Sequence, residues 1–451
     1  MWESVAVVLA AIAALWHGAH SPNDGAASQA PLSVAQVMAL KPAHMQAPVT
    51  SAEGERAARD AEWAALQAFL ATPFDPASDE VLPAVLESIA LFNWDAALAQ
   101  PQTFQALPRL ADKPVEYQRA VLTGVHTLYA RQAAPAVAAL LPALVTPKEF
   151  AIAAYTMLRA SDTQDQRARL RTHMRANFPA WEQEPRLIAL ERRLRPEPPS
   201  DLSVRPALRD LLAAPLKPGY PVVFSLQRQN RHYPGLAVIR GNDGRFVRNP
   251  DGSLFALPQL ALAKSGLPGT ITNGNTPQGL FVVKGTVRAT NVWIGPTPAL
   301  HSKLPTEASV EEFEHAPSSD PAQTPVAWDE SRYRSYWPVS WQDYAPLREA
   351  WLAGLAGRDE IWIHGDTVNP EYYRNAPYFP YAPSAGCLVA MEYWSKDDGT
   401  LLQSDQLALV KAFASTGQLQ GYLVVVDLDD RPQAVAVVDV LHELLAAEAG
   451  R

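Results

Sequence analysis

Apolar and polar residues follow one another with different spacings in the two halves of the chain. From Ser33 to about Arg195, apolar residues recur at steps of three and four, as in residues 62–70 (EWAALQAFL). This spacing predicts amphipathic helices, and prolines stand where helices would begin or end. We interpret this half as a spacer or a partner-binding surface, because no pattern in it indicates chemistry. The expected helical segments are residues 79–99, 114–131, 133–144, 147–160, 163–177 and 185–195.

The second half contains short runs of β-branched and aromatic residues, which are typical of strands. Residues 242–244 (Asn-Asp-Gly) lie between two of these runs and are a strong hairpin signal. Residues 269–283 (GTITNGNTPQGLFVV) indicate a loop that enters a strand. The sequence thus predicts an α+β multidomain protein, with an α-helical N-terminal region followed by a mainly β domain. The expected strands are residues 221–226, 236–240, 246–248, 280–283, 361–363 and 422–427, with helices around 407–415 and 434–447.

These patterns divide the chain into five segments. Residues 1–30 contain the eleven-residue apolar run Val5–Leu15, which suits the core of a signal peptide and is short for a transmembrane helix. We expect a signal peptide or an N-terminal anchor there, and a buried or amphipathic first helix is the alternative. The other segments are an α-helical domain (31–195), a linker (196–215), the mainly β domain (216–431) with an aromatic-rich insertion at about 286–350, and a C-terminal helix (432–451).

The composition of the chain excludes several classes of protein and of binding site. The 451 residues are 48% hydrophobic and 19% charged, which argues for a folded protein and against a coiled coil or a polytopic membrane protein. Lys and Arg number 38 against 47 Asp and Glu, and no basic block occurs, so no nucleic-acid partner is expected. Cys387 is the one cysteine, so neither an internal disulfide nor a cysteine-based zinc site can form. We expect no metal and no organic cofactor.

Cys387 and His364 are the residues best placed to carry chemistry. Cys387 lies in a turn of Pro and small residues, 383–388, and such a turn can expose a nucleophile. His364 follows the expected strand 361–363, and a thiol needs a proton acceptor of this kind to become a reactive thiolate. The alternative is that the lone cysteine is a small buried apolar residue, which is the commoner use of a cysteine.

Three motifs together resemble the L,D-transpeptidase catalytic-domain family of bacterial peptidoglycan enzymes. They are the loop and strand of residues 275–281 (NTPQGLF), then Ile363-His364-Gly365, then Ser384-Ala385-Gly386-Cys387, in the family's order. The resemblance covers about residues 216–430 and implies a mixed β-sandwich. It implies that Cys387 attacks a peptide carbonyl to form a thioester and that His364 is general base and later general acid. Ser384 would shape the turn, and the backbone N–H groups of Ala385, Gly386 and Cys387 would stabilise the oxyanion.

The chain departs from the commoner family pattern at two positions beside the nucleophile. Ala385 stands where that pattern has a second histidine, and residues 388–390 (Leu-Val-Ala) replace a hydrophobic residue followed by Arg. A branch of the family also reads Ser-x-Gly-Cys without that histidine, and it includes enzymes that cleave murein crosslinks. The departures therefore bear on how the substrate is recognised, because the histidine and the arginine of the commoner pattern are both missing.

Gly365, Ala385, Trp337 and Trp341 are the expected substrate-binding residues. The two tryptophans belong to the aromatic-rich insertion, whose rings can stack on the sugars of a glycan strand or close a lid; a small core that holds a long loop is the alternative. An arginine can supply the missing carboxylate contact, although each candidate is more often a surface charge. The candidate arginines are Arg332, Arg334, Arg358 and Arg374.

The resemblance implies a cysteine-dependent peptidoglycan L,D-transpeptidase, an enzyme that transfers acyl groups between murein stem peptides. Its expected location is the periplasm, free or anchored to the inner membrane. Its expected partners are stem peptides, glycan strands and an envelope protein bound through the helical region. Two alternatives stay open: a murein peptide or crosslink hydrolase that uses the same Cys387–His364 site, and a non-catalytic glycan-binding envelope protein.

Overall fold

A computed structural model describes residues 31–76, 79–195, 204–316 and 326–450. The chain forms two compact units. The described part of the helical unit comprises residues 52–195 and 264–267, and that of the second unit comprises residues 31–51, 204–263 and 268–450. No helix in these ranges is both long and apolar enough to cross a membrane. The expected signal peptide or anchor, residues 1–30, lies outside the described residues.

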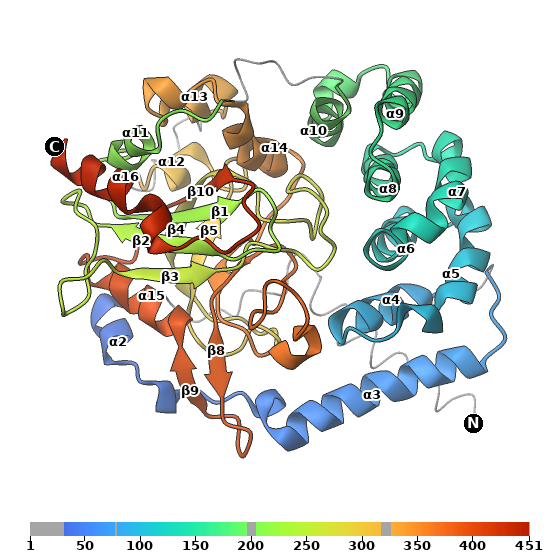
Figure 1. The fold of residues 1–451 in the computed structure, drawn as a ribbon, viewed down its shortest axis with the longest axis horizontal. Coiled ribbons are helices and arrows are strands. Elements are labelled where there is room, and N and C mark those ends of the chain that lie inside the picture. Colours follow the sequence, from blue (N-terminus) through green and yellow to red (C-terminus); the bar gives the residue numbers. More distant parts are fainter. Residues whose placement is uncertain (1–30, 77–78, 196–203, 317–325, 451) are drawn as a thin grey trace. The chain divides into compact units, whose positions relative to one another are not determined.

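The helical unit is a succession of short helices, as predicted for residues 79–195 (Figure 1). Several helices have a proline in their first turn, where the missing N–H would have had no partner in the helix. The central helix is α8, which contacts α6, α7, α9 and α10 and is buried from Glu149 to Thr156. The helices are α3 (Ala52–Ala71), α4 (Leu82–Leu91), α5 (Gln100–Ala106), α6 (Val115–Leu128), α7 (Ala130–Leu140), α8 (Pro147–Ala160), α9 (Gln164–Asn177) and α10 (Pro185–Leu194).

The second unit is built on an eight-stranded mixed sheet of order β3-β2-β1-β10-β4-β5-β6-β7. The pairs β1–β10 and β6–β7 are parallel and the others antiparallel, while β8 and β9 form a separate two-stranded sheet. The strands are β1 (Val222–Arg228), β2 (Gly235–Arg240), β3 (Ala256–Gln259), β4 (Gly279–Val287), β5 (Ala299–Lys303), β6 (Ile363–His364), β7 (Leu388–Val389), β8 (Glu392–Trp394), β9 (Leu401–Ser404) and β10 (Gly421–Asp429).

Helices accompany this sheet, so the second unit is α+β rather than mainly β. Side chains of α14 and α15 lie with Phe281, Ile363 and Leu388 in one buried apolar cluster. The expected strand 246–248 makes only two isolated bridges, Phe246 to Arg240 and Arg248 to Leu254, because the chain turns back at Gly244 before it and at Gly252 after it. The helices are α2 (Val34–Ala39), α11 (Leu208–Ala213), α12 (Val310–Phe313), α13 (Glu330–Ser335), α14 (Glu349–Leu355), α15 (Asp405–Ala414) and α16 (Val437–Ala449).

Two segment boundaries differ from the sequence-based division. Residues 31–51 were expected in the helical domain but belong to the second unit, where Val37 is fully buried in the apolar cluster and Ala47 N–H donates to the carbonyl of Gly399. Burial of one such valine contributes about 1.5–3 kcal/mol. Residues 196–215 were expected to be a linker, but the part of them that the structure describes contains the helix α11. This helix packs on α16, and its leucines are buried. Neither contact has a local sequence signal, because its partners are distant in the chain.

Acid is expected to weaken the helical unit through His126. This ring is buried on α6, and its Nδ1 lies 3.2 Å from the Oγ1 of Thr156. Burial, with a smaller contribution from the charge of Arg159, lowers the pKa of His126 to about 3. A neutral buried His contributes stability above the unfolded-state pKa of 6.5, and this is lost as pH falls from there towards 3.

The test is His126→Asn, followed by urea unfolding of the whole protein with circular dichroism as the signal. The wild type should be more stable at pH 7, and its advantage should shrink by about 1.4 kcal/mol for each pH unit below 6.5. A stability difference that is the same at pH 7 and pH 4 would contradict this assignment.

Candidate active site

The pairing of β6 with β7 brings the two sequence motifs together. The register sets Ile363 opposite Leu388 and His364 opposite Val389 in parallel strands. Cys387, one residue before β7, is therefore level with Trp362, and His364 lies two residues further along the neighbouring strand. A strand spacing of ~4.8 Å and a rise of ~3.3 Å per residue place the Cα atoms of Cys387 and His364 on the order of 8 Å apart.

Successive side chains of β6 and β7 point to opposite faces of the sheet, so His364 lies on the face opposite the large apolar cluster. Ile363 and Leu388 both lie in the large apolar cluster of the second unit, so they face one side of the sheet. Val389 packs on the other side, in a second cluster with Leu260 and tyrosines of the 373–381 segment. His364 is paired with Val389 and therefore projects to this other side.

His364 is buried and held in one tautomer. Its Nδ1–H donates to the carbonyl of Gly365 at 2.5 Å, which leaves the lone pair on Nε2. Burial lowers the pKa of His364 to about 4, and the hydrogen bond to Gly365 opposes this shift. The imidazole is therefore neutral above that pH, and Nε2 is available as a base. The backbone carbonyl supplies the orienting partner that the sequence does not name.

Cys387 as a whole is partly exposed, but its thiol lies against the backbone of the segment before β6. Its Sγ accepts a hydrogen bond from Trp362 N–H and donates one to the Glu360 carbonyl, both at 3.4 Å. Within the described ranges, no hydrogen bond joins the thiol to His364. Burial raises the pKa of Cys387 to about 11, while the Trp362 N–H and the charge of Arg358 lower it. The resting pair is therefore a neutral thiol and a neutral imidazole.

Ser384 and Gly386 shape the turn that carries the thiol. The Ser384 hydroxyl accepts from Gly386 N–H and donates to the Cys387 carbonyl, each at 2.9 Å. Gly386 has φ +120°, which favours glycine, and a Cβ there would lie 1.8 Å from an Arg358 nitrogen. Ser384 thus occupies the Gly386 N–H, which was expected as an oxyanion donor. In the described chain the N–H groups of Ala385 and Cys387 make no hydrogen bond, and Ala385 is exposed.

The loop of residues 269–279 is fastened to this turn. The Thr276 hydroxyl donates to the Gly386 carbonyl at 2.8 Å. The Asn275 side chain accepts the N–H of Ala263, and Ser384 N–H donates to the Leu262 carbonyl. The Thr-Pro-x-Gly-x-Phe segment therefore touches the turn that carries Cys387, although the bonded residues Thr276 and Gly386 are 110 positions apart.

Arg358 has a role that sequence reasoning missed. It was considered only as a surface charge or a substrate contact, but it is 5% exposed and its guanidinium faces inward. It donates to the carbonyls of Gly269, Gly274 and Asn275 at 2.6, 2.5 and 2.7 Å. Burial lowers its pKa to about 10, which leaves it charged at neutral pH. The other candidate arginines pair near the surface: Arg332 with Glu314, Arg334 with Asp343 and Arg374 with Glu371.

Trp337 and Trp341 do not fit the expected substrate-binding role. They are 3% and 0% exposed, and the Trp341 indole N–H donates to the Ala207 carbonyl. Trp337 packs edge-on against Tyr333, whose hydroxyl holds Leu280 N–H. The aromatic-rich insertion therefore forms a small core against β4, which was the alternative. Gly365 lies against the Glu392 carboxyl and has no room for a side chain.

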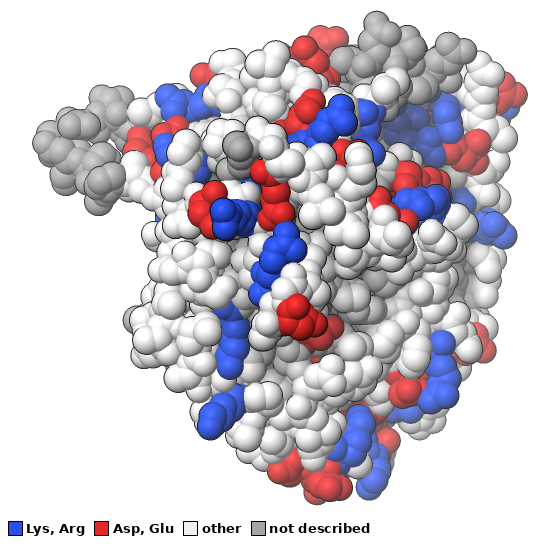
Figure 2. All heavy atoms as spheres, turned by 60° about the vertical axis from the view of Figure 1, so that its left-hand side comes forward, with Lys and Arg blue, Asp and Glu red and all other residues white. Residues whose placement is uncertain are grey.

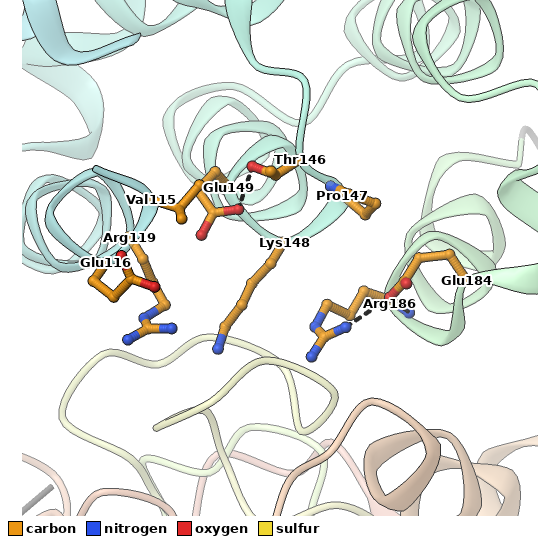
Figure 3. A pocket seen from close by; sticks show the side chains of 9 residues that line it. All are labelled: Val115, Glu116, Arg119, Thr146, Pro147, Lys148, Glu149, Glu184 and Arg186. Atoms are coloured by element: carbon orange, nitrogen blue, oxygen red, sulfur yellow. Dashed lines mark hydrogen bonds and ion pairs between the residues drawn. The ribbon is translucent and has the colours of Figure 1, made fainter. Parts of the chain in front are cut away.

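Hollows elsewhere on the surface do not resemble an active site. One, of about 320 Å³, is lined by the starts of α6, α8 and α10 (Figure 3). Its basic residues Arg119, Lys148 and Arg186 extend to one side, but Glu116, Glu149 and Glu184 stand among them, and Glu184 pairs with Arg186. On the face seen in Figure 2, basic and acidic side chains are likewise intermingled. Within the residues that the structure describes, no three His, Cys, Asp or Glu side chains could hold a metal ion.

Comparison of the chain with protein-family models, with curated proteins and with solved structures found no match.

The neutral resting pair predicts slow thiol chemistry in the free protein. Because the pKa of Cys387 is raised from 9.0 to about 11, its thiolate fraction at pH 8 should be about a hundredfold below that of an ordinary cysteine. Alkylation by iodoacetamide, followed by intact mass, should therefore accelerate with pH up to about 11. Cys387→Ser should take up no label, since Cys387 is the one cysteine. A rate that levels off below pH 9 would contradict the raised pKa.

Proposed function

We propose that the protein is a cysteine acyltransferase of the L,D-transpeptidase type, acting on peptidoglycan stem peptides. The observation that carries this proposal is the β6–β7 pairing, which sets Cys387 and a tautomerically fixed His364 two residues apart on neighbouring parallel strands. The contact of Thr276 with the Gly386 carbonyl adds the third motif to the same place. The proposal includes the finer fold assignment, an L,D-transpeptidase-like β-sandwich, and a periplasmic location, free or anchored.

The proposed reaction begins with proton transfer from the thiol to Nε2 of His364 as the sulfur attacks the substrate carbonyl. A resting pKa of about 11 for the thiol and about 4 for the imidazole makes this transfer unfavourable without substrate. The sulfur–carbon bond therefore forms in step with the loss of the proton. The imidazolium then returns the proton to the leaving amine, which gives a thioester. An acceptor amine, deprotonated by the same Nε2, releases the acyl group.

The free N–H groups of Ala385 and Cys387 are the proposed oxyanion donors. Both belong to the turn that presents the sulfur, and neither is used inside the described structure. Removal of one oxyanion donor costs enzymes about 10²–10³ in turnover. The Gly386 N–H is not among the proposed oxyanion donors, because it donates to the Ser384 hydroxyl and so fixes the turn.

Hydrolysis at the same site is the second candidate function. It is favoured by Val389, which stands where the commoner pattern has a guanidinium and is fully buried in the Leu260 cluster. With no basic side chain at that position, the site has fewer groups that can hold a stem-peptide carboxylate. Transfer to an amine competes with attack by water only when the amine acceptor is held in position.

The helical unit is the proposed contact surface for an envelope protein, whichever reaction the site performs.

Substitution of the pair tests the proposal. Cys387→Ala should abolish turnover of purified muropeptides, and His364→Ala should lower it by 10²–10⁴-fold. The double variant should be little worse than Cys387→Ala, because the two residues act as one unit. By family resemblance, a carbapenem should add its mass to the wild type and not to Cys387→Ala. Full activity of Cys387→Ala would support the non-catalytic alternative.

Labelled water separates transfer from hydrolysis. Crosslinked and uncrosslinked muropeptides incubated with the protein in ¹⁸O water should give new crosslinks without label if transfer dominates. Products that carry ¹⁸O at the new carboxylate, without new crosslinks, would establish the hydrolase instead. Cys387→Ala is the control for uncatalysed exchange.

A further inference from the structure

Arg358 is a buried cation that lacks a carboxylate partner among the residues that the structure describes. Its guanidinium donates to three backbone carbonyls of one loop and forms no ion pair with any described residue. Two other deeply buried arginines of this unit do have carboxylate partners. Arg228 pairs with Asp429 and Asp439, and Arg231 pairs with Asp427 at 2.6 Å.

A buried charge of this kind is costly unless an opposite charge compensates it. Carbonyl dipoles from Gly269, Gly274 and Asn275 stabilise the guanidinium but leave its net charge in place. One of its nitrogens lies so close to Gly386 that a Cβ there would meet it at 1.8 Å. The uncompensated charge thus lies directly beneath the residue that precedes Cys387.

We propose that Arg358 is the positioning residue that stabilises the Cys387 thiolate, as the counter-ion that forms its ion pair only when the sulfur ionises. In that step the thiol proton passes to Nε2 of His364, so the sulfur becomes negative and the imidazole positive, and no further reactant is needed. The inference rests on the proposed role of Cys387 as nucleophile.

Other charged groups around the thiol oppose Arg358. Glu360 and Glu307 act on Cys387 in the opposite direction, Glu360 from the segment before β6 and Glu307 from the loop after β5. Glu307 accepts from the N–H groups of Leu304 and Glu360, and burial raises its pKa to about 7. Asp359 acts on Arg358 itself, and His364, on β6, is neutral. Arg358 is therefore the one cation that favours the thiolate. The net stabilisation of the thiolate should fall when Glu307 is ionised and rise when it is neutral.

The experiment compares the alkylation rate of Cys387 in four variants at pH 8.5, with iodoacetamide and intact mass. Arg358→Met should slow alkylation at least about tenfold, the effect of one pKa unit on the thiolate fraction. Arg358→Lys keeps the charge and should stay within about threefold of the wild type. Glu307→Gln removes an opposing carboxylate and should accelerate alkylation. The matched control is Arg231→Met. Arg231 is also a buried arginine and also holds the loop, by donating to the Thr276 carbonyl, but its charge is already paired with Asp427.

The control separates charge from packing. If Arg358→Met and Arg231→Met slow alkylation equally, or if neither slows it, Arg358 only holds the loop and the proposal fails. If Arg358→Met does not fold, as judged by circular dichroism, Glu307→Gln decides: an unchanged alkylation rate overturns the proposal and a faster one supports it. The assay does not need turnover. Inactivity on muropeptides with the expected alkylation pattern would remove the proposed function and leave the charge assignment standing.

Discussion

The candidate site depends on a parallel pairing of only two residues in each strand, β6 with β7. Such a short ladder does not hold itself, and the surrounding chain supplies the missing bonds. The buried Gln406 amide of α15 donates to the Ile363 carbonyl, and Leu260 exchanges two backbone hydrogen bonds with Val389. Thr276 holds the turn itself through the Gly386 carbonyl. A change that shifts one of these anchors is expected to move Cys387 relative to His364, because no hydrogen bond joins these two side chains in the described structure.

The helices of the first half were predictable because their signal is local. Apolar spacing and first-turn prolines determine where a helix begins and which face it buries, and the expected segments 147–160 and 163–177 agree closely with α8 and α9. The expected segment 79–99 breaks after α4, where Asn93 has a positive φ. The strands around the site were located only roughly: the expected 361–363 is β6 at Ile363–His364, because its length is set by the partner strand.

The residues that meet at the candidate site were predictable, but their surroundings were not. Cys387 and His364 are brought to neighbouring strands, and Ser384 shapes the turn as expected. Arg358 was not recognisable, because an arginine held by three backbone carbonyls has the same sequence appearance as one in solvent. The burial of Trp337 and Trp341 was equally invisible, since aromatic residues suit a core and a binding surface alike.

The placement of residues 31–51 on the second unit has a consequence for biosynthesis. The Leu32 N–H bonds to Thr286, 254 residues away, and Gln46 reaches Asp398 across 352 residues. The helical unit is thus an insertion within the fold of the second unit, with most of its contacts inside one continuous stretch of chain. A ribosome releases that stretch early, and it can fold while synthesis continues. The second unit must wait for β10, and its first segment then closes over strands made several hundred residues later, a non-local step that is slow by its topology.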